Sequence, residues 1–140
     1  DSGRVGVAAQ AVGIARGAFE IAKAYAEERE QFGKKLKEHQ AIAFKIADMH
    51  VKIAAARALV LEAARKKDRG ERFTLEASAA KLFASAAAVE VTREAVQVLG
   101  GYGSHRDYRA ERYYRGARAP ATSEGTSEIQ RLVIARELYR

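Results

Sequence analysis

A helical repeat of small apolar residues continues through most of this chain and constrains its fold more than any other feature. Apolar side chains recur every three or four residues from Val5 to Ala26, and similar stripes occupy residues 42–63 and 75–99. A stripe of this period puts its apolar residues on one face of a helix, which must be buried against another element. The only proline, Pro120, lies outside all three stripes. Long packed helices are therefore predicted, and a β-sandwich or barrel is disfavoured.

A shorter fourth stripe covers residues 129–138. Ser2 and Thr126 are suited to cap the first and last helices, because their hydroxyl oxygens can accept hydrogen bonds from free backbone N–H groups. The connections between the first three helices are short, which makes consecutive helices antiparallel neighbours. We expect an all-α fold: an up-down-up-down four-helix bundle with one short extra helix, near residues 108–115, before the last long helix. Residues 1–140 are predicted to form a single domain.

Composition and charge restrict the function classes. The chain has no cysteine, which excludes disulfide frameworks, thiolate metal sites and cysteine nucleophiles. The formal net charge of +7 makes nucleic acid, an anionic membrane surface or an anionic ligand candidate partners. No uncharged apolar run approaches ~18 residues, so no membrane span is predicted. No signal-peptide pattern opens the chain, and a cytoplasmic protein is expected.

Arginine recurs at every third residue from Arg106 to Arg118, with tyrosines in between. Basic residues interleaved with aromatics are typical of single-stranded nucleic-acid binding. A spacing of three residues, however, drifts about 60° per step around an α-helix, so these arginines do not share one face. A solvated segment with ion pairs is the competing interpretation. The histidines, His39, His50 and His105, show no metal-ligand spacing, so no metal site is predicted.

Two local features allow a structural or a functional interpretation. Gly100-Gly101 follows the third stripe, where glycines commonly end a helix. Glycines there would also let the backbone approach a pyrophosphate closely. Glu124 lies just ahead of the last helix, where an acidic residue complements the helix dipole. Held over a substrate, the same carboxylate could act as a general base.

Four distinctive blocks follow one another along the chain. They are Asp1-Ser2-Gly3-Arg4, Glu28-Arg29-Glu30-Gln31-Phe32-Gly33, Gln97-Val98-Leu99-Gly100-Gly101-Tyr102-Gly103 and Glu124-Gly125-Thr126-Ser127-Glu128-Ile129-Gln130. In this order and spacing the blocks resemble the C-terminal domain of the acyl-CoA dehydrogenases, and the resemblance covers essentially all 140 residues. Four ordered blocks at family spacing are highly specific.

The resemblance implies an activity, a cofactor and partners. Members of the family oxidise the Cα–Cβ bond of an acyl-CoA thioester with FAD and pass the electrons to an electron-transfer flavoprotein. Glu124 falls on the position of the base that removes the α-proton in most members. The C-terminal bundles of the family meet at the centre of a tetramer, so self-association as a dimer or tetramer is expected.

The resemblance also implies binding roles. Asp1 and Arg4 fall near the acyl-CoA site, while Thr126 and Glu128 fall beside the FAD of their own subunit. Arginine and open glycines suit a pyrophosphate. The positions that fall on contacts with the FAD of a neighbouring subunit are Arg29, Gln31, Phe32, Gln97, Gly100 and Gly101.

The chain departs from the family pattern at Lys35, Ser104 and residues 116–123. At 116–123 small or polar residues replace the branched and aromatic residues that usually precede the base. Such changes suit a surface that has lost its covering domain, because exposed apolar patches promote aggregation. The family enzyme is also much longer, and its FAD lies between this bundle and two further domains. These departures predict an engineered or re-surfaced bundle, an engineered or de novo protein, that stands alone.

Such a bundle would lack bound FAD and dehydrogenase activity and would act as a scaffold or binding module. The first alternative is that the chain is part of a working acyl-CoA dehydrogenase with Glu124 as the base. The second alternative is a basic helical module that binds nucleic acid.

Overall fold

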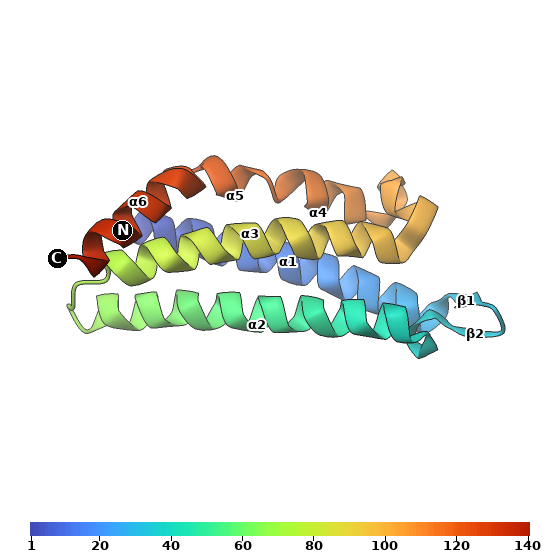
Figure 1. Ribbon diagram of the computed structural model, residues 1–140. Helices are drawn as coiled ribbons and strands as arrows, with labels where there is room; N and C mark the ends of the chain where they lie inside the picture. The colour runs from blue at the N-terminus through green and yellow to red at the C-terminus, as the bar shows by residue number, and fades with distance from the viewer.

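Three long helices run the length of the molecule, and a series of shorter helices fills the fourth position of the bundle (Figure 1). The computed structural model describes residues 1–140. The long helices are α1 (Ser2–Glu28), α2 (Gln40–Asp68) and α3 (Thr74–Leu99). The fourth position holds α4 (Ala110–Gly116), α5 (Ala119–Thr122) and α6 (Ser127–Leu138). The predicted all-α bundle, with a short helix before the last long one, is confirmed.

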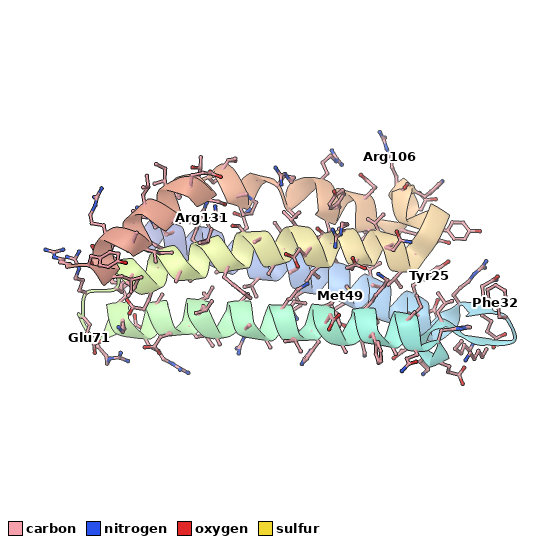
Figure 2. All side chains as sticks on the ribbon, in the orientation of Figure 1. Tyr25, Phe32, Met49, Glu71, Arg106 and Arg131 are labelled. Atoms are coloured by element: carbon pink, nitrogen blue, oxygen red, sulfur yellow. The ribbon has the colours of Figure 1, made fainter.

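The connection between α1 and α2 contains a small hairpin that the hydrophobic pattern does not predict. Strand β1 (Glu30–Gln31) pairs antiparallel with β2 (Lys34–Lys35), and a 3₁₀ turn, η1 (Leu36–Glu38), leads into α2. Phe32 and Gly33, between the strands, both have positive φ, at 55° and 78°. Two successive residues of positive φ are characteristic of the type I′ turn of two-residue hairpin loops. The turn carries Phe32 away from the bundle (Figure 2).

The core explains the abundance of alanine. Helices α1 and α3 run in the same direction and pack on each other more extensively than any other pair. Small side chains allow such close packing, whereas larger ones would force the helices apart. The buried residues of α1 are all alanines: Ala8, Ala11, Ala15, Ala18, Ala22 and Ala26.

Helix α1 is also long and apolar enough, by length and composition alone, to cross a membrane. The sequence pattern predicts no membrane span, because charged residues interrupt the apolar run. Core helices of helical bundles pass the same test, so the property is weak evidence for a membrane. In this structure the alanine face of α1 packs on its neighbouring helices, as a core helix does.

The segment after α3 folds back onto the bundle through two 3₁₀ turns, η2 (Gly100–Ser104) and η3 (Arg106–Tyr108). Gly100 has a φ of 60° and ends α3, as predicted. A Cβ on Gly103 would lie 2.3 Å from the carbonyl oxygen of Val96, so only glycine lets η2 pack this closely on α3.

Residues 116–123 are exposed at five of eight positions, as expected of a surface stretch, but the segment also packs on the bundle. Ala117 and Pro120 are buried, and α5 packs on both α3 and α1. Pro120 lies in the first turn of α5, where its missing N–H leaves no helical hydrogen bond unmade. Packing therefore accounts for the small size of Ala117, and that size is no sign of engineering.

Candidate functional site

The candidate site residues form two groups at opposite ends of the bundle. One group, here named the Glu124 end, lies where α1 and α3 begin and where α6 packs alongside them (Figure 1). The other, here named the hairpin end, lies where α1 and α3 finish, beside β1 and β2. Helix α1 has 27 residues, so the two groups are about 40 Å apart at a rise of 1.5 Å per residue.

Glu124 lies in the tight turn between α5 and α6. Its φ is 55°, and that of the next residue, Gly125, is 92°, so two successive residues have left-handed backbone. A Cβ built on Gly3 would be 2.7 Å from Oε2 of Glu124, which places the carboxylate directly against the first turn of α1. Glu124 is exposed in this chain. The carboxylate is thus held at the surface, over the start of α1.

Buried side chains of α3 and α6 hold this turn from the side of the core, through hydrogen bonds to its backbone. The ammonium of Lys81, on α3, donates hydrogen bonds to the carbonyl oxygens of Ala121 (3.1 Å) and Gly125 (2.5 Å). Nε2 of Gln130, on α6, donates to the carbonyl oxygens of Glu124 and Gly125, each at 3.1 Å. Burial lowers the pKa of Lys81 below its usual value, because desolvation disfavours the charged form.

Neither Lys81 nor Gln130 is predicted to be buried from the hydrophobic pattern. A signal for Lys81 is nevertheless present in the sequence. Its position is one turn from Ala77 and Ala84, which lie on the buried face of α3. A lysine inside an alanine stripe marks a place where the core must satisfy a charge.

Asp1 and Arg4 lie beside Gly3 and therefore close to Glu124. The carboxylate of Asp1 accepts hydrogen bonds from Arg4 and from Oγ1 of Thr74, the latter at 2.7 Å. The second bond ties the start of α1 to the start of α3. Asp1, rather than the predicted Ser2, is the N-terminal boundary residue of α1, and Ser2 is already helical.

Thr126 caps α6, as predicted: its Oγ1 accepts a hydrogen bond from the N–H of Ile129 at 3.4 Å. Glu128 lies in the first turn of α6. Hydrogen bonds from its own backbone N–H and from the Thr126 hydroxyl hold its pKa below the ordinary value. The structure therefore brings Asp1, Arg4, Glu124, Thr126 and Glu128 together at one end of the bundle.

The hairpin end contains a hollow of about 540 Å³. Its lining includes Arg29, Gln31, Gly100 and Gly101 of the predicted set, together with Tyr102 and His105. Phe32 does not line the hollow, because it projects from the hairpin and is 95% exposed (Figure 2). Gln97 also lies outside, on the exposed side of the last turn of α3.

The chemistry of the hollow suits a nucleotide. A Cβ on Gly100 or Gly101 would meet nothing within 4 Å, so the backbone there is open to a ligand. The guanidinium of Arg29 lies 5.9 Å from the ring centre of Tyr102, which in turn lies 5.0 Å from the ring of Tyr108. A cation, an open backbone and aromatic rings are groups that hold a phosphate and a planar ring. These residues therefore fit part of a flavin dinucleotide.

The five arginines between Arg106 and Arg118 are distributed over several elements. Arg106 lies in η3 and points away from the bundle (Figure 2), whereas Arg109 has left-handed backbone between η3 and α4. Arg115 is within 3.6 Å of Glu111, one turn earlier on α4. The arginines thus form no single basic face.

Comparison with known proteins identifies the family. Residues 1–139 match the model of the acyl-CoA dehydrogenase C-terminal domain. The chain is 50% identical over its full length to the short-chain specific acyl-CoA dehydrogenase of Clostridium acetobutylicum, of which it covers 37%. It is 48% identical over its full length to the caffeyl-CoA reductase-Etf complex subunit CarC of Acetobacterium woodii, again covering 37%.

The fold agrees with these matches. Butyryl-CoA dehydrogenase from Megasphaera elsdenii superimposes with a TM-score of 0.96 at 49% identity, over 98% of this chain and 36% of that one. The chain thus spans about a third of the length of the relatives it matches. Identity near 50% to natural enzymes gives no support to an engineered or de novo origin, and it favours the alternative of a working acyl-CoA dehydrogenase. The chain belongs to the FAD-dependent acyl-CoA dehydrogenase family and corresponds to its C-terminal helical domain.

Proposed function

We propose that this chain is the C-terminal bundle of a working acyl-CoA dehydrogenase and that Glu124 is its catalytic base. The observation that carries the proposal is the turn at Glu124, which holds an exposed carboxylate in left-handed backbone over Gly3. Asp1 and Arg4, the residues proposed to lie at the acyl-CoA, flank the same glycine. The proposed base, the space left by the missing side chain of Gly3 and two polar residues for the substrate thus lie together at one end of the bundle.

In the proposed reaction the Glu124 carboxylate takes the proton from Cα of the thioester. The electron pair of that C–H bond becomes the second bond between Cα and Cβ, as a hydride leaves Cβ. FAD, when bound, supplies the acceptor for the hydride. Arg4 and Asp1 orient the acyl-CoA, and Thr126 and Glu128 hold the flavin of the same subunit.

The hairpin end is proposed to serve the FAD of a neighbouring subunit. Arg29 and the open backbone at Gly100 and Gly101 would hold its phosphates, while Gln31, Phe32 and Gln97 would contact its remaining groups. This division requires self-association, as a dimer or tetramer. Exposed apolar residues support such contacts, because large exposed apolar groups mark interaction surfaces. They include Phe44 and Val51 on α2 and Leu132 and Leu138 on α6. An electron-transfer flavoprotein is the proposed electron acceptor.

The test is flavin bleaching in the FAD-loaded complete enzyme that carries this bundle. Butyryl-CoA is the first substrate to use, because a structural relative is a butyryl-CoA dehydrogenase. The wild type should bleach, and Glu124→Gln should bleach about 10²- to 10⁴-fold more slowly, the usual contribution of a general base. Glu62→Gln, on the exposed side of α2, is the matched control and should bleach like the wild type. Wild-type bleaching by Glu124→Gln would refute the proposed base.

The same assay on residues 1–140 alone, with added FAD, tests the stand-alone interpretation. If the complete enzyme bleaches and the isolated bundle does not, catalysis requires sequence outside these residues. Bleaching by the bundle alone would show that these residues suffice. Light scattering on the same samples measures the oligomer, and a monomeric complete enzyme would contradict the shared FAD site.

A further inference from the structure

Lys81 is the largest fully buried side chain of the molecule, with 0% exposure. An ammonium group removed from water is costly unless hydrogen bonds replace the lost hydration. Lys81 forms no ion pair; its bonds go to the carbonyl oxygens of Ala121 and Gly125, on either side of Glu124. Of the charged groups around it, Glu128 of α6 favours the charged ammonium and Arg4 of α1 opposes it. The bonds of this buried charge therefore all go to the turn that carries the base.

The turn needs such support. Glu124 has a φ of 55°, a left-handed conformation that costs energy for any residue with a side chain. Strained backbone of this kind persists only where the surrounding structure determines it. Gln130 holds the same turn through the carbonyl oxygens of Glu124 and Gly125. Two side chains, from α3 and α6, thus fix the carbonyl groups of Ala121, Glu124 and Gly125 in one strained turn.

The side chain of Glu124 has no such support of its own. Its carboxylate oxygens accept no hydrogen bond and form no ion pair with another residue, and Gly3 offers only a space beside them. The position of the carboxylate therefore depends on the backbone that carries it. Whatever fixes the carbonyl groups of this turn also aims the carboxylate.

We propose that Lys81 is a positioning residue: its buried ammonium fixes the turn between α5 and α6 and thereby aims the Glu124 carboxylate at the substrate. The proposal rests on the function of Glu124 proposed above. Lys81 does not touch the substrate. Its effect on the reaction passes through two hydrogen bonds and the backbone of residues 121–125.

The first experiment is Lys81→Met in the FAD-loaded complete enzyme, assayed with butyryl-CoA. Methionine has a similar shape but no N–H donor. We expect kcat per bound flavin to fall about 10- to 100-fold, as when an outer partner that orients a reacting group is lost. KM should change little. The kinetic isotope effect on kcat with α-deuterated substrate should rise, because proton removal becomes the slower step.

Lys45→Met is the matched control. Lys45 also pairs with a partner on α3, Glu94, but far from the turn. It should lower thermal stability while leaving kcat per flavin and the isotope effect unchanged. If Lys81→Met instead lowers only FAD content or melting temperature, with wild-type kcat per flavin, Lys81 is merely structural and the proposal is overturned.

Hydrogen exchange gives a second readout, independent of turnover. In Lys81→Met the backbone amides of residues 123–126 should exchange faster, while those in the middle of α1 keep their wild-type rates. Unchanged exchange in the turn would overturn the proposal. Should Lys81→Met fail to fold, Lys81→Leu, which also lacks an N–H donor, replaces it in both measurements.

A failure of the proposed role of Glu124 gives different results from a failure of the proposed role of Lys81. If Glu124→Gln retains wild-type activity, Glu124 is not the base, and the aiming of that carboxylate falls with it. In that case faster exchange in Lys81→Met would still show that the lysine holds the turn. If Glu124→Gln is inactive and Lys81→Met is wild-type in both measurements, only the role of Lys81 is refuted.

Discussion

The two ends of the bundle differ in how far their polar groups and surfaces are satisfied within the chain. At the Glu124 end the chain satisfies its own polar groups: Lys81 and Gln130 bind the carbonyls of the turn, and Asp1 links two helix starts. At the hairpin end the chain leaves a hollow open and presents Phe32 almost fully to solvent. Hydrogen bonds within the chain hold the Glu124 end in place. The hairpin end has an open hollow that a ligand or a second subunit can fill. A family match that covers the whole chain does not reveal this difference; the hydrogen bonds do.

The largest effect should come from Gly125→Ala. Gly125 has a φ of 92°, and a Cβ there would lie 2.8 Å from Nε2 of Gln130. The change strains the backbone and displaces one of the groups that hold the turn. We expect a loss of about 1–3 kcal/mol in the free energy of unfolding, measured by urea denaturation, together with a large fall in kcat. Gly70→Ala, also at positive φ but in open space, is the control for strain alone. Equal activity in the two variants would show that the turn is not specially organised.

Gly3→Ala should separate activity from stability. Its Cβ would lie 2.7 Å from Oε2 of Glu124, which is the end of a flexible side chain and can move away. Helix propensity favours alanine by about 1 kcal/mol, so the melting temperature should not fall. Activity should drop several-fold, because the carboxylate is displaced from its position. Gly6→Ala, which meets nothing within 4 Å, should keep wild-type activity. A fully active Gly3→Ala enzyme would argue against the proposed placement of the base.

At the hairpin end, Arg29→Ala should weaken cofactor binding without affecting the fold. Arg29 lines the hollow and makes no ion pair that holds the bundle. Loss of a charged hydrogen bond to phosphate should raise the Kd for FAD about tenfold, as measured by titration of the apoenzyme of the complete protein. Lys34→Ala, on the neighbouring strand, is the control. If Arg29→Ala unfolds the bundle, the hairpin end is not the open end described here.

Acid should produce the smallest effect and should act on both ends. Hydrogen bonds from Arg72 and Lys45 lower the pKa of Glu137 and Glu94, respectively, below the ordinary value of 4.5. A carboxylate whose folded-state pKa is depressed stabilises the fold above its unfolded pKa, and the stabilisation is lost as the pH falls through the folded value. The melting temperature should therefore fall modestly below pH 4.5. Glu137→Gln should reduce this fall, and an unchanged acid profile in that variant would contradict the assignment.

Sequence periodicity predicts the helices well, because each long helix buries one continuous stripe. It does not predict the hairpin of β1 and β2, which depends on the turn chemistry of two residues, Phe32 and Gly33. It also does not separate the buried from the exposed positions within residues 116–123, since small residues suit an exposed surface as well as a closely packed helix. Ala117 and Pro120 are buried while Arg118 and Ala119 are exposed, and only the packing of this segment against the bundle decides between the two.

Candidate site residues could be predicted only where they lie in one of the four sequence blocks that resemble the family. Glu124 and Arg29 follow from such blocks, and the structure assigns them to different ends of the molecule. Lys81 belongs to no block, and its role depends on hydrogen bonds to residues 40 and 44 positions away in the chain. Contacts over such separations have no periodic signature, so composition and spacing cannot reveal them.

The alanine face shared by α1 and α3 has a consequence for distance. Both helices extend from the Glu124 end to the hairpin end, and tight packing of small side chains resists sliding of one helix along the other. In the proposed assembly these helices therefore set the separation between one subunit's base and the end of the same subunit that contacts its neighbour's flavin. Inserting one helical turn into both helices would lengthen that separation by about 5.4 Å.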